Sequence, residues 1–180
     1  MDLGISGKTA LVTGGVQGIG QSITKYLAMA GVKVVATTRS QSAIDEFSQE
    51  KFDGIENVIF YKTELTGEHD IEKLVAFLDE KKLTLDILVN NAGHTLNITD
   101  PYCSIQEWRD VFGLNFELPV RLINTFVPAM KATGWGRIVN ITSCAGLENS
   151  GPVTFSAAKA ALTAYTRSMG RILAIEAPNV

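Results

Sequence analysis

The segment "KTALVTGGVQGIG" (8–20) passes from a short apolar run rich in β-branched residues, through a glycine-rich loop, into a stretch with helical period. Such a loop between a strand and a helix is typical of dinucleotide-binding domains, because the free N–H groups and the dipole of the helix attract a pyrophosphate. Gly14 permits a tight turn, while Gly18 and Gly20 leave room for the dinucleotide beside the helix. We therefore predict a nucleotide site at Gly14, Gln17, Gly18, Ile19 and Gly20; the alternative is an ordinary strand-to-helix turn.

Strand-like runs and helical segments alternate along the rest of the chain. Strands are expected at 8–14, 33–38, 57–63, 85–93 and 136–143, and helices at 18–30, 41–50, 68–82, 104–131 and 154–176. Most of these strands are apolar without alternation, as is usual where helices cover both faces of a parallel sheet. The pattern predicts an α/β fold, a Rossmann-type doubly wound parallel sheet in three layers, α/β/α. Because Pro119 cannot donate to the residue four positions earlier, we expect a kink near Asn115.

Length and the absence of internal boundaries predict one domain. The chain has 180 residues, with no linker, repeat or low-complexity tract, so we expect a single NAD(P)-binding Rossmann domain over 1–180. The chain stops at "EAPNV" (176–180), directly after a long helical segment, where an open parallel sheet normally continues into another strand. We therefore expect the domain to be incomplete at its C-terminal end, with one or more strands missing.

Composition and charge exclude several other classes of protein. The net charge is −3 and no cluster of Lys and Arg occurs, which argues against binding to nucleic acid or to an anionic membrane. No apolar run approaches the roughly 18 residues of a membrane helix, and the N-terminus lacks the pattern of a signal peptide. Cys103 and Cys144 are far apart and lack metal-type spacing, which favours a cytoplasmic location and no metal site.

The end of the second expected strand, "VVATTRS" (34–40), bears on the choice of cofactor. An NAD-binding domain would place Asp or Glu here to bind the ribose 2′-hydroxyl. This chain has Thr38 and Arg39 instead, and a guanidinium matches the oxygens of a 2′-phosphate. NADP(H) is therefore favoured over NAD(H). The alternative is that Arg39 is simply a solvated residue before a helix.

Several motifs follow one another along the chain: the glycine-rich loop, "NNAG" (90–93), Asn115, Ser143 and Lys159. In this order and at these separations the chain resembles the short-chain dehydrogenase/reductase family over its whole length. The resemblance implies that Asn91, Ala92 and Gly93 form a wall of the cofactor pocket, although Asn and Gly are also common where strands end. It implies, more loosely, that Glu64 and Leu65 lie near the adenine.

The resemblance also implies a catalytic set. Asn115 would hold a water in a proton relay, Ser143 would bind the substrate oxygen, and Lys159 would bind the nicotinamide ribose. Lys159 would also lower the pKa of a tyrosine four residues earlier, which exchanges the proton with substrate. Position 155 is Phe155, which keeps the ring and loses the proton.

No other residue supplies the missing acid. Tyr165 is followed four residues later by Met169 and not by lysine, and Ser156 would point to another face of the helix. Phe155 is then either a natural replacement in a cofactor-binding module or mixed oligomer, or an introduced Tyr-to-Phe change that stops chemistry and keeps shape. The coexistence of Asn115, Ser143 and Lys159 favours the second.

The function expected from these residues is an NADP-dependent oxidoreductase that transfers hydride between nicotinamide and a carbonyl or alcohol, in an inactive or severely impaired form. The alternatives are a non-catalytic nucleotide-binding or regulatory subunit, and a degraded fragment without function. Polar residues in the loops 94–97 and 147–149 suggest a hydroxylated or sugar-like small molecule, with His94, Asn97, Leu147 and Glu148 as candidate contacts.

A homodimer or homotetramer is also expected. The helices 104–131 and 154–176 are apolar on more than one face, and in the family that the chain resembles these helices pack against a second subunit. The alternative is deeper burial within one chain.

Overall fold

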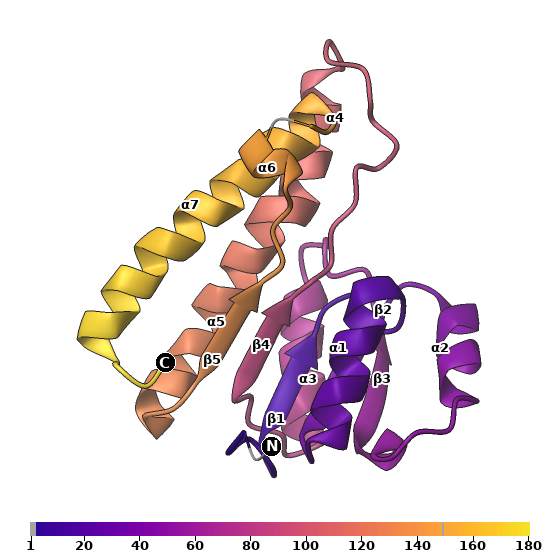
Figure 1. The fold of residues 1–180 in the computed structure, drawn as a ribbon, viewed down its shortest axis with the longest axis vertical. Helices are drawn as coiled ribbons and strands as arrows, with labels where there is room; N and C mark the ends of the chain where they lie inside the picture. Colours follow the sequence, from indigo (N-terminus) through magenta and orange to yellow (C-terminus); the bar gives the residue numbers. More distant parts are fainter. Residues whose placement is uncertain (1–2, 149) are drawn as a thin grey trace. The chain divides into compact units, whose positions relative to one another are not determined.

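The computed structural model describes residues 3–148 and 150–180, so Asn149, part of the polar loop 147–149, lies outside the described residues. The chain separates into two compact units (Figure 1). The first comprises Met1–Asn91 with Gly136–Val139, and the second comprises Ala92–Trp135 with Asn140–Val180. Each unit is described by itself.

A parallel sheet forms the first unit. Its strands are β1 (Thr9–Val12), β2 (Lys33–Thr38), β3 (Val58–Lys62), β4 (Ile87–Asn90) and β5 (Arg137–Asn140, of which Asn140 belongs to the second unit), in the order β3-β2-β1-β4-β5. β1 pairs in parallel with β2 and β4, with Leu11 beside Val35 and Leu88. These three side chains are fully buried, as expected for apolar strands covered on both faces. The predicted α/β, Rossmann-type doubly wound fold is confirmed.

Helices of the first unit follow the strands as the sequence predicts. They are α1 (Gly18–Met29), α2 (Gln41–Ser48), the short 3-10 helix η1 (Ile55–Asn57) and α3 (Asp70–Glu80). α1 contacts β1 and β2, and α2 contacts β2. Phe47 of α2 packs edge-on against Phe60 of β3, with ring centroids 5.4 Å apart. This packing holds the C-terminal end of α2 against the sheet.

The second unit is helical and differs from the sequence prediction in a break within one expected helix and in a short helix that was not expected. Its elements are α4 (Ile105–Phe112), the π-helix η2 (Gly113–Glu117), α5 (Leu118–Thr133), α6 (Ala145–Glu148) and α7 (Val153–Glu176). The single helix expected over 104–131 is interrupted by η2, where the Leu118 N–H donates to the Gly113 carbonyl five residues earlier. Pro119 stands at the start of α5, and because it has no N–H the α-helical hydrogen bond to Asn115 cannot form.

Within this unit α7 contacts α4, η2 and α6. Phe116 of η2 meets Tyr165 of α7 edge-on, with centroids 6.0 Å apart, and Asn140 Nδ2 donates to Thr166 Oγ1 at 2.8 Å. The ring contact fixes the π-helix against α7, and the hydrogen bond fixes the end of β5 against α7. This matters because Asn115 lies on the π-helix and Lys159 on α7. Across the described ranges, no helix is long and apolar enough to span a membrane.

Candidate cofactor pocket and active site

The glycine-rich loop of the first unit packs tightly against the start of α1 at Gly20 and leaves free space beside Gly18. Gly14 has a φ of 62°, in the left-handed region that favours glycine. At Gly20 a Cβ atom would lie 2.1 Å from the main-chain oxygen of Gly14, so α1 begins too close to the loop for any side chain. At Gly18, by contrast, a Cβ would meet no atom within 4 Å. A ligand could therefore approach the main chain at Gly18.

Asn91 fastens the end of β4 to this loop. Its N–H donates to Thr13 Oγ1 at 2.9 Å, and its Nδ2 donates to the carbonyls of Thr13 at 2.9 Å and Gly14 at 3.1 Å. These bonds make Asn91 a brace that positions the loop. Its predicted contact with a cofactor stays a prediction.

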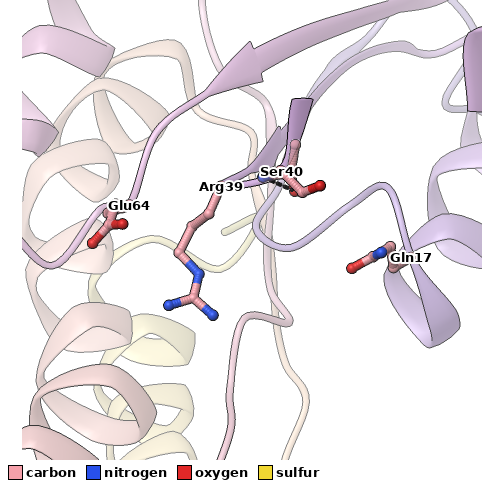
Figure 2. A pocket seen from close by; sticks show the side chains of 5 residues that line it. Gln17, Arg39, Ser40 and Glu64 are labelled. Atoms are coloured by element: carbon pink, nitrogen blue, oxygen red, sulfur yellow. Dashed lines mark hydrogen bonds between the residues drawn. The ribbon is translucent and has the colours of Figure 1, made fainter. Parts of the chain in front are cut away.

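An open pocket of about 340 Å³ is lined by Gln17, Thr38, Arg39, Ser40 and Glu64. The Arg39 side chain extends into the space between Glu64 and Gln17 (Figure 2). A volume of this size is within the range of small-molecule sites. The pocket brings together residues from the glycine-rich loop and from the ends of β2 and β3, which the sequence analysis had proposed separately.

Ser40 is the one lining residue that the sequence analysis missed. Its Oγ accepts a hydrogen bond from the Ala43 N–H at 3.1 Å and so caps α2. A serine directly before a helical period is an N-cap signal that could have identified it. Ile19 is 66% exposed and Leu65 is 2% exposed, and neither lines this pocket; their predicted contact with a cofactor stays a prediction.

In the second unit, Asn115 is fully buried in the π-helix. Its Nδ2 donates to the carbonyls of His94 at 2.8 Å and Val111 at 2.9 Å, and its Oδ1 accepts from the His94 N–H at 3.2 Å. Both hydrogens of the carboxamide are thus committed to main-chain carbonyls. Asn115 holds the main chain of His94 from both sides. Because both Nδ2 hydrogens are used, a water of a proton relay would have to bind an atom of Asn115 other than Nδ2.

Gly93 lies between Asn115 and Lys159. A Cβ on Gly93 would be 2.8 Å from Asn115 Oδ1 and 3.0 Å from Lys159 Nζ. Only a glycine therefore fits here without displacing one of these two side chains. Residues that are 66 positions apart in the sequence, 93 and 159, meet at this point.

Lys159 is buried, with 4% of its surface exposed. Its Nζ donates to the Ile141 carbonyl at 2.9 Å. Burial disfavours the charged form and lowers the pKa of Lys159 from 10.5 to about 8. The ammonium lies 5.7 Å from the centre of the Phe155 ring, so the four-residue spacing does place residues 155 and 159 side by side.

Ser143 lies two residues beyond Ile141, between β5 and α6, and is half-buried. Its Oγ accepts a hydrogen bond from the Ala145 N–H at 3.2 Å, which leaves its own hydrogen available to donate. The structure thus brings Gly93, Asn115, Phe155 and Lys159 together in the second unit, with Ser143 on the segment that holds Lys159. In the described part of the chain, no group of three or more His, Cys, Asp or Glu could hold a metal ion.

Comparison with known proteins gives a consistent result. Residues 8–177 match the short chain dehydrogenase family. The short chain dehydrogenase penD of Penicillium thymicola is 36% identical over 94% of this chain and 65% of its own length. The 3-oxoacyl-(acyl-carrier-protein) reductase FabG of Vibrio cholerae is 33% identical over 96% of this chain and 70% of its own length.

A solved structure agrees with the sequence comparison. The crystal structure of a proposed gluconate dehydrogenase from Agrobacterium tumefaciens superimposes with a TM-score of 0.84 at 28% identity, over 96% of this chain and 68% of that one. The chain therefore spans about two thirds of the length of these proteins. On the family match and the identity to these relatives, the chain belongs to the short chain dehydrogenase family.

Proposed function

We propose that the chain is an NADP(H)-dependent oxidoreductase site that interconverts a carbonyl and an alcohol, with turnover impaired because Phe155 stands where a proton donor is needed. The observation that carries this proposal is the Lys159 ammonium, buried and 5.7 Å from the Phe155 ring centre. A buried ammonium is costly to retain. It is explained if this part of the chain is built around a group at position 155 that needs a cation beside it.

The chemistry of the site follows from proton balance. When bound, a nicotinamide supplies or accepts the hydride at the reacting carbon. The oxygen on that carbon then needs a proton in reduction, and a tyrosine with an ordinary pKa of about 10 supplies it near neutrality only if a cation lowers that pKa. Phe155 has no proton to give. Loss of a general acid lowers the rate by about 10² to 10⁴, whereas cofactor binding does not depend on that hydroxyl.

The pocket at the end of β2 fits the adenosine 2′-phosphate of NADP(H). Arg39 supplies a guanidinium, and the hydroxyls of Thr38 and Ser40 lie on the same short segment. The described pocket has its one carboxylate on Glu64, after β3, and not at the end of β2 where NAD-binding domains carry an acid. The open space at Gly18 would take the pyrophosphate.

The names of the similar proteins support the reaction class. FabG is named as a 3-oxoacyl reductase and the Agrobacterium protein as a proposed gluconate dehydrogenase. Both names refer to interconversion of a carbonyl with an alcohol. The substrate of this chain is proposed only as a small hydroxylated carbonyl or alcohol.

Phe155→Tyr tests the proposal. With NADPH and a panel of ketones and aldehydes, the variant should consume NADPH at least 10²-fold faster than the Phe155 chain, followed by nicotinamide absorbance. The matched control is Phe155→Tyr combined with Lys159→Met, which supplies the hydroxyl without the cation and should stay slow near pH 7. Tight NADPH binding with no gain of activity over the whole panel would contradict the proposal.

That outcome would instead support a non-catalytic nucleotide-binding or regulatory subunit. This second function is favoured by one observation: the loop at Gly14–Gly20 and the Arg39 pocket are formed without any help from position 155. Failure of NADPH to raise the melting temperature of the chain would count against both functions.

We also propose a homodimer or homotetramer. Ile105 on α4 is 68% exposed, and Ile172 and Ile175 on α7 are 45% and 84% exposed. Large exposed apolar side chains on long helices favour association. Sedimentation velocity would show a species of two or four chains, and a monomer at micromolar concentration would contradict it.

A further inference from the structure

His94 is the residue after Gly93, and its main chain is held on both sides. Its N–H donates to Asn115 Oδ1 at 3.2 Å, and its carbonyl accepts from Asn115 Nδ2 at 2.8 Å. Consecutive Cα atoms are about 3.8 Å apart, so His94 begins next to the point where Gly93 faces Asn115 and Lys159. A side chain at position 94 therefore starts within a few ångströms of the proposed reacting groups.

The imidazole of His94 is also fixed. The Leu96 N–H donates to His94 Nδ1 at 2.8 Å, so Nδ1 must act as an acceptor. In a neutral imidazole the proton then resides on Nε2. Nε2 lies across the ring from Nδ1, and because the residue as a whole is exposed, Nε2–H is available as a hydrogen-bond donor.

The turn that fixes the ring is strained. Leu96 and Asn97 have φ values of 55° and 61°, consecutive left-handed conformations in residues other than glycine. The Ile98 N–H closes the turn onto the Thr95 carbonyl at 3.0 Å. A left-handed conformation costs a leucine about 1 to 2 kcal/mol and an asparagine less, and such strain persists where the surroundings impose it, often at ligand sites.

We propose that His94 Nε2–H donates a hydrogen bond to a second oxygen of the substrate, a hydroxyl or carbonyl next to the reacting carbon. The proposal rests on the proposed function, since it names the substrate class of that same site: an α-hydroxyketone, or the corresponding diol, in preference to a simple ketone. Unlike a general acid, His94 would bind and orient the substrate and transfer no proton.

Two substitutions separate this role from a merely structural one. His94→Asn keeps an acceptor at the position of Nδ1, which can still receive the Leu96 N–H as in an Asx turn, but it has no donor at the position of Nε2. His94→Gln places an amide nitrogen near the position of Nε2. If His94 serves only the turn, Asn should replace it fully; if it binds substrate, Gln should be the better replacement.

The experiment uses the Phe155 chain, in which slow turnover allows ligands to be titrated. We would label the imidazole nitrogens with ¹⁵N, assign the signals of the two histidines with His69→Gln, and read the tautomer from carbon-bound ring protons. NADPH-loaded protein is then titrated with 3-hydroxy-2-butanone and with 2-butanone, which differ by one hydroxyl. The expected results are an Nε2–H tautomer and a shift of the Nε2 signal with the hydroxyketone alone.

Affinities of the variants complete the test. His94→Asn should weaken hydroxyketone binding about three- to tenfold, the value of one neutral hydrogen bond, and leave 2-butanone unchanged; His94→Gln should retain more of the preference. An Nδ1–H tautomer, or an unchanged preference in His94→Asn, would overturn the proposal. The tautomer is read without cofactor and NADPH binding is measured by thermal shift in the same samples, so failure of the proposed function is seen separately.

Discussion

Replacement of Lys159 by methionine gives the most quantitative test of the second unit. The ammonium is 4% exposed and bonds to the Ile141 carbonyl, and among the described residues no carboxylate pairs with it. Burial lowers the pKa of Lys159 from 10.5 to about 8. A shift of that size corresponds to about 3 kcal/mol of unfavourable free energy carried by the charged form in the folded state.

The sign of the pH dependence follows from proton binding. Below pH 8 the lysine is protonated in both the folded and the unfolded chain, so the full cost of about 3 kcal/mol is present. Between pH 8 and 10.5 the folded chain loses the proton first, the unfolded chain holds more protons, and stability rises with pH. The unfolding free energy of the unmodified chain minus that of Lys159→Met should therefore rise by about 3 kcal/mol between pH 7 and 11.

Urea unfolding at closely spaced pH values measures this difference. At pH 7 the variant should be at least as stable as the unmodified chain, because relief of charge burial offsets the lost bond to Ile141, about 1 to 3 kcal/mol. Lys33→Met, at an exposed position on β2, is the control and should show no such slope. A difference that is constant with pH, or that falls as pH rises, would refute the reasoning.

Two predictions concern the first unit. Arg39→Asp should shift the cofactor preference from NADPH toward NADH, measured as the ratio of dissociation constants, while Lys33→Asp at the other end of the same strand should not; an unchanged ratio in Arg39→Asp would contradict the 2′-phosphate assignment. Gly20→Ala should lower the melting temperature far more than Gly18→Ala, because its Cβ would lie 2.1 Å from the Gly14 oxygen, whereas Gly18 carries only the cost of a left-handed φ, about 1 to 2 kcal/mol. Equal effects of the two would contradict the packing argument.

Most of the fold could be predicted from local patterns in the sequence. The strand over 33–38 was predicted at its observed bounds. In an α/β chain, an uninterrupted run rich in β-branched residues between two segments with helical period indicates a strand. The helix expected over 104–131 was wrong in its continuity, since apolar spacing alone does not register a wider turn. Pro119 did mark the correct place, because its missing N–H limits which hydrogen bonds can form there.

The candidate site was predictable to different degrees. The Phe155–Lys159 pair follows from helical spacing, and the structure places the two side chains together. The approach of Gly93 to Lys159 joins distant segments and was not predicted, since the resemblance to a family placed each residue beside the cofactor but not beside the other. The commitment of Asn115 to the main chain of His94 was not predictable, because both partners of those bonds depend on how a loop and a π-helix meet.

The π-helix has a consequence for the spacing of the residues around it. In an α-helix each residue advances about 100° around the axis, and the five-residue turn closed by Gly113 and Leu118 accommodates one more residue than an α-turn would. A chain one residue shorter between 113 and 117 could form an unbroken helix, in which Leu118 would still follow Gly113 by one turn; side chains beyond the deletion would keep nearly their direction, whereas those inside the turn, Asn115 among them, would be displaced. The number of residues between 113 and 117 is therefore constrained independently of their identity. A shorter chain could keep its asparagine and still lose the hydrogen bonds to the main chain of His94.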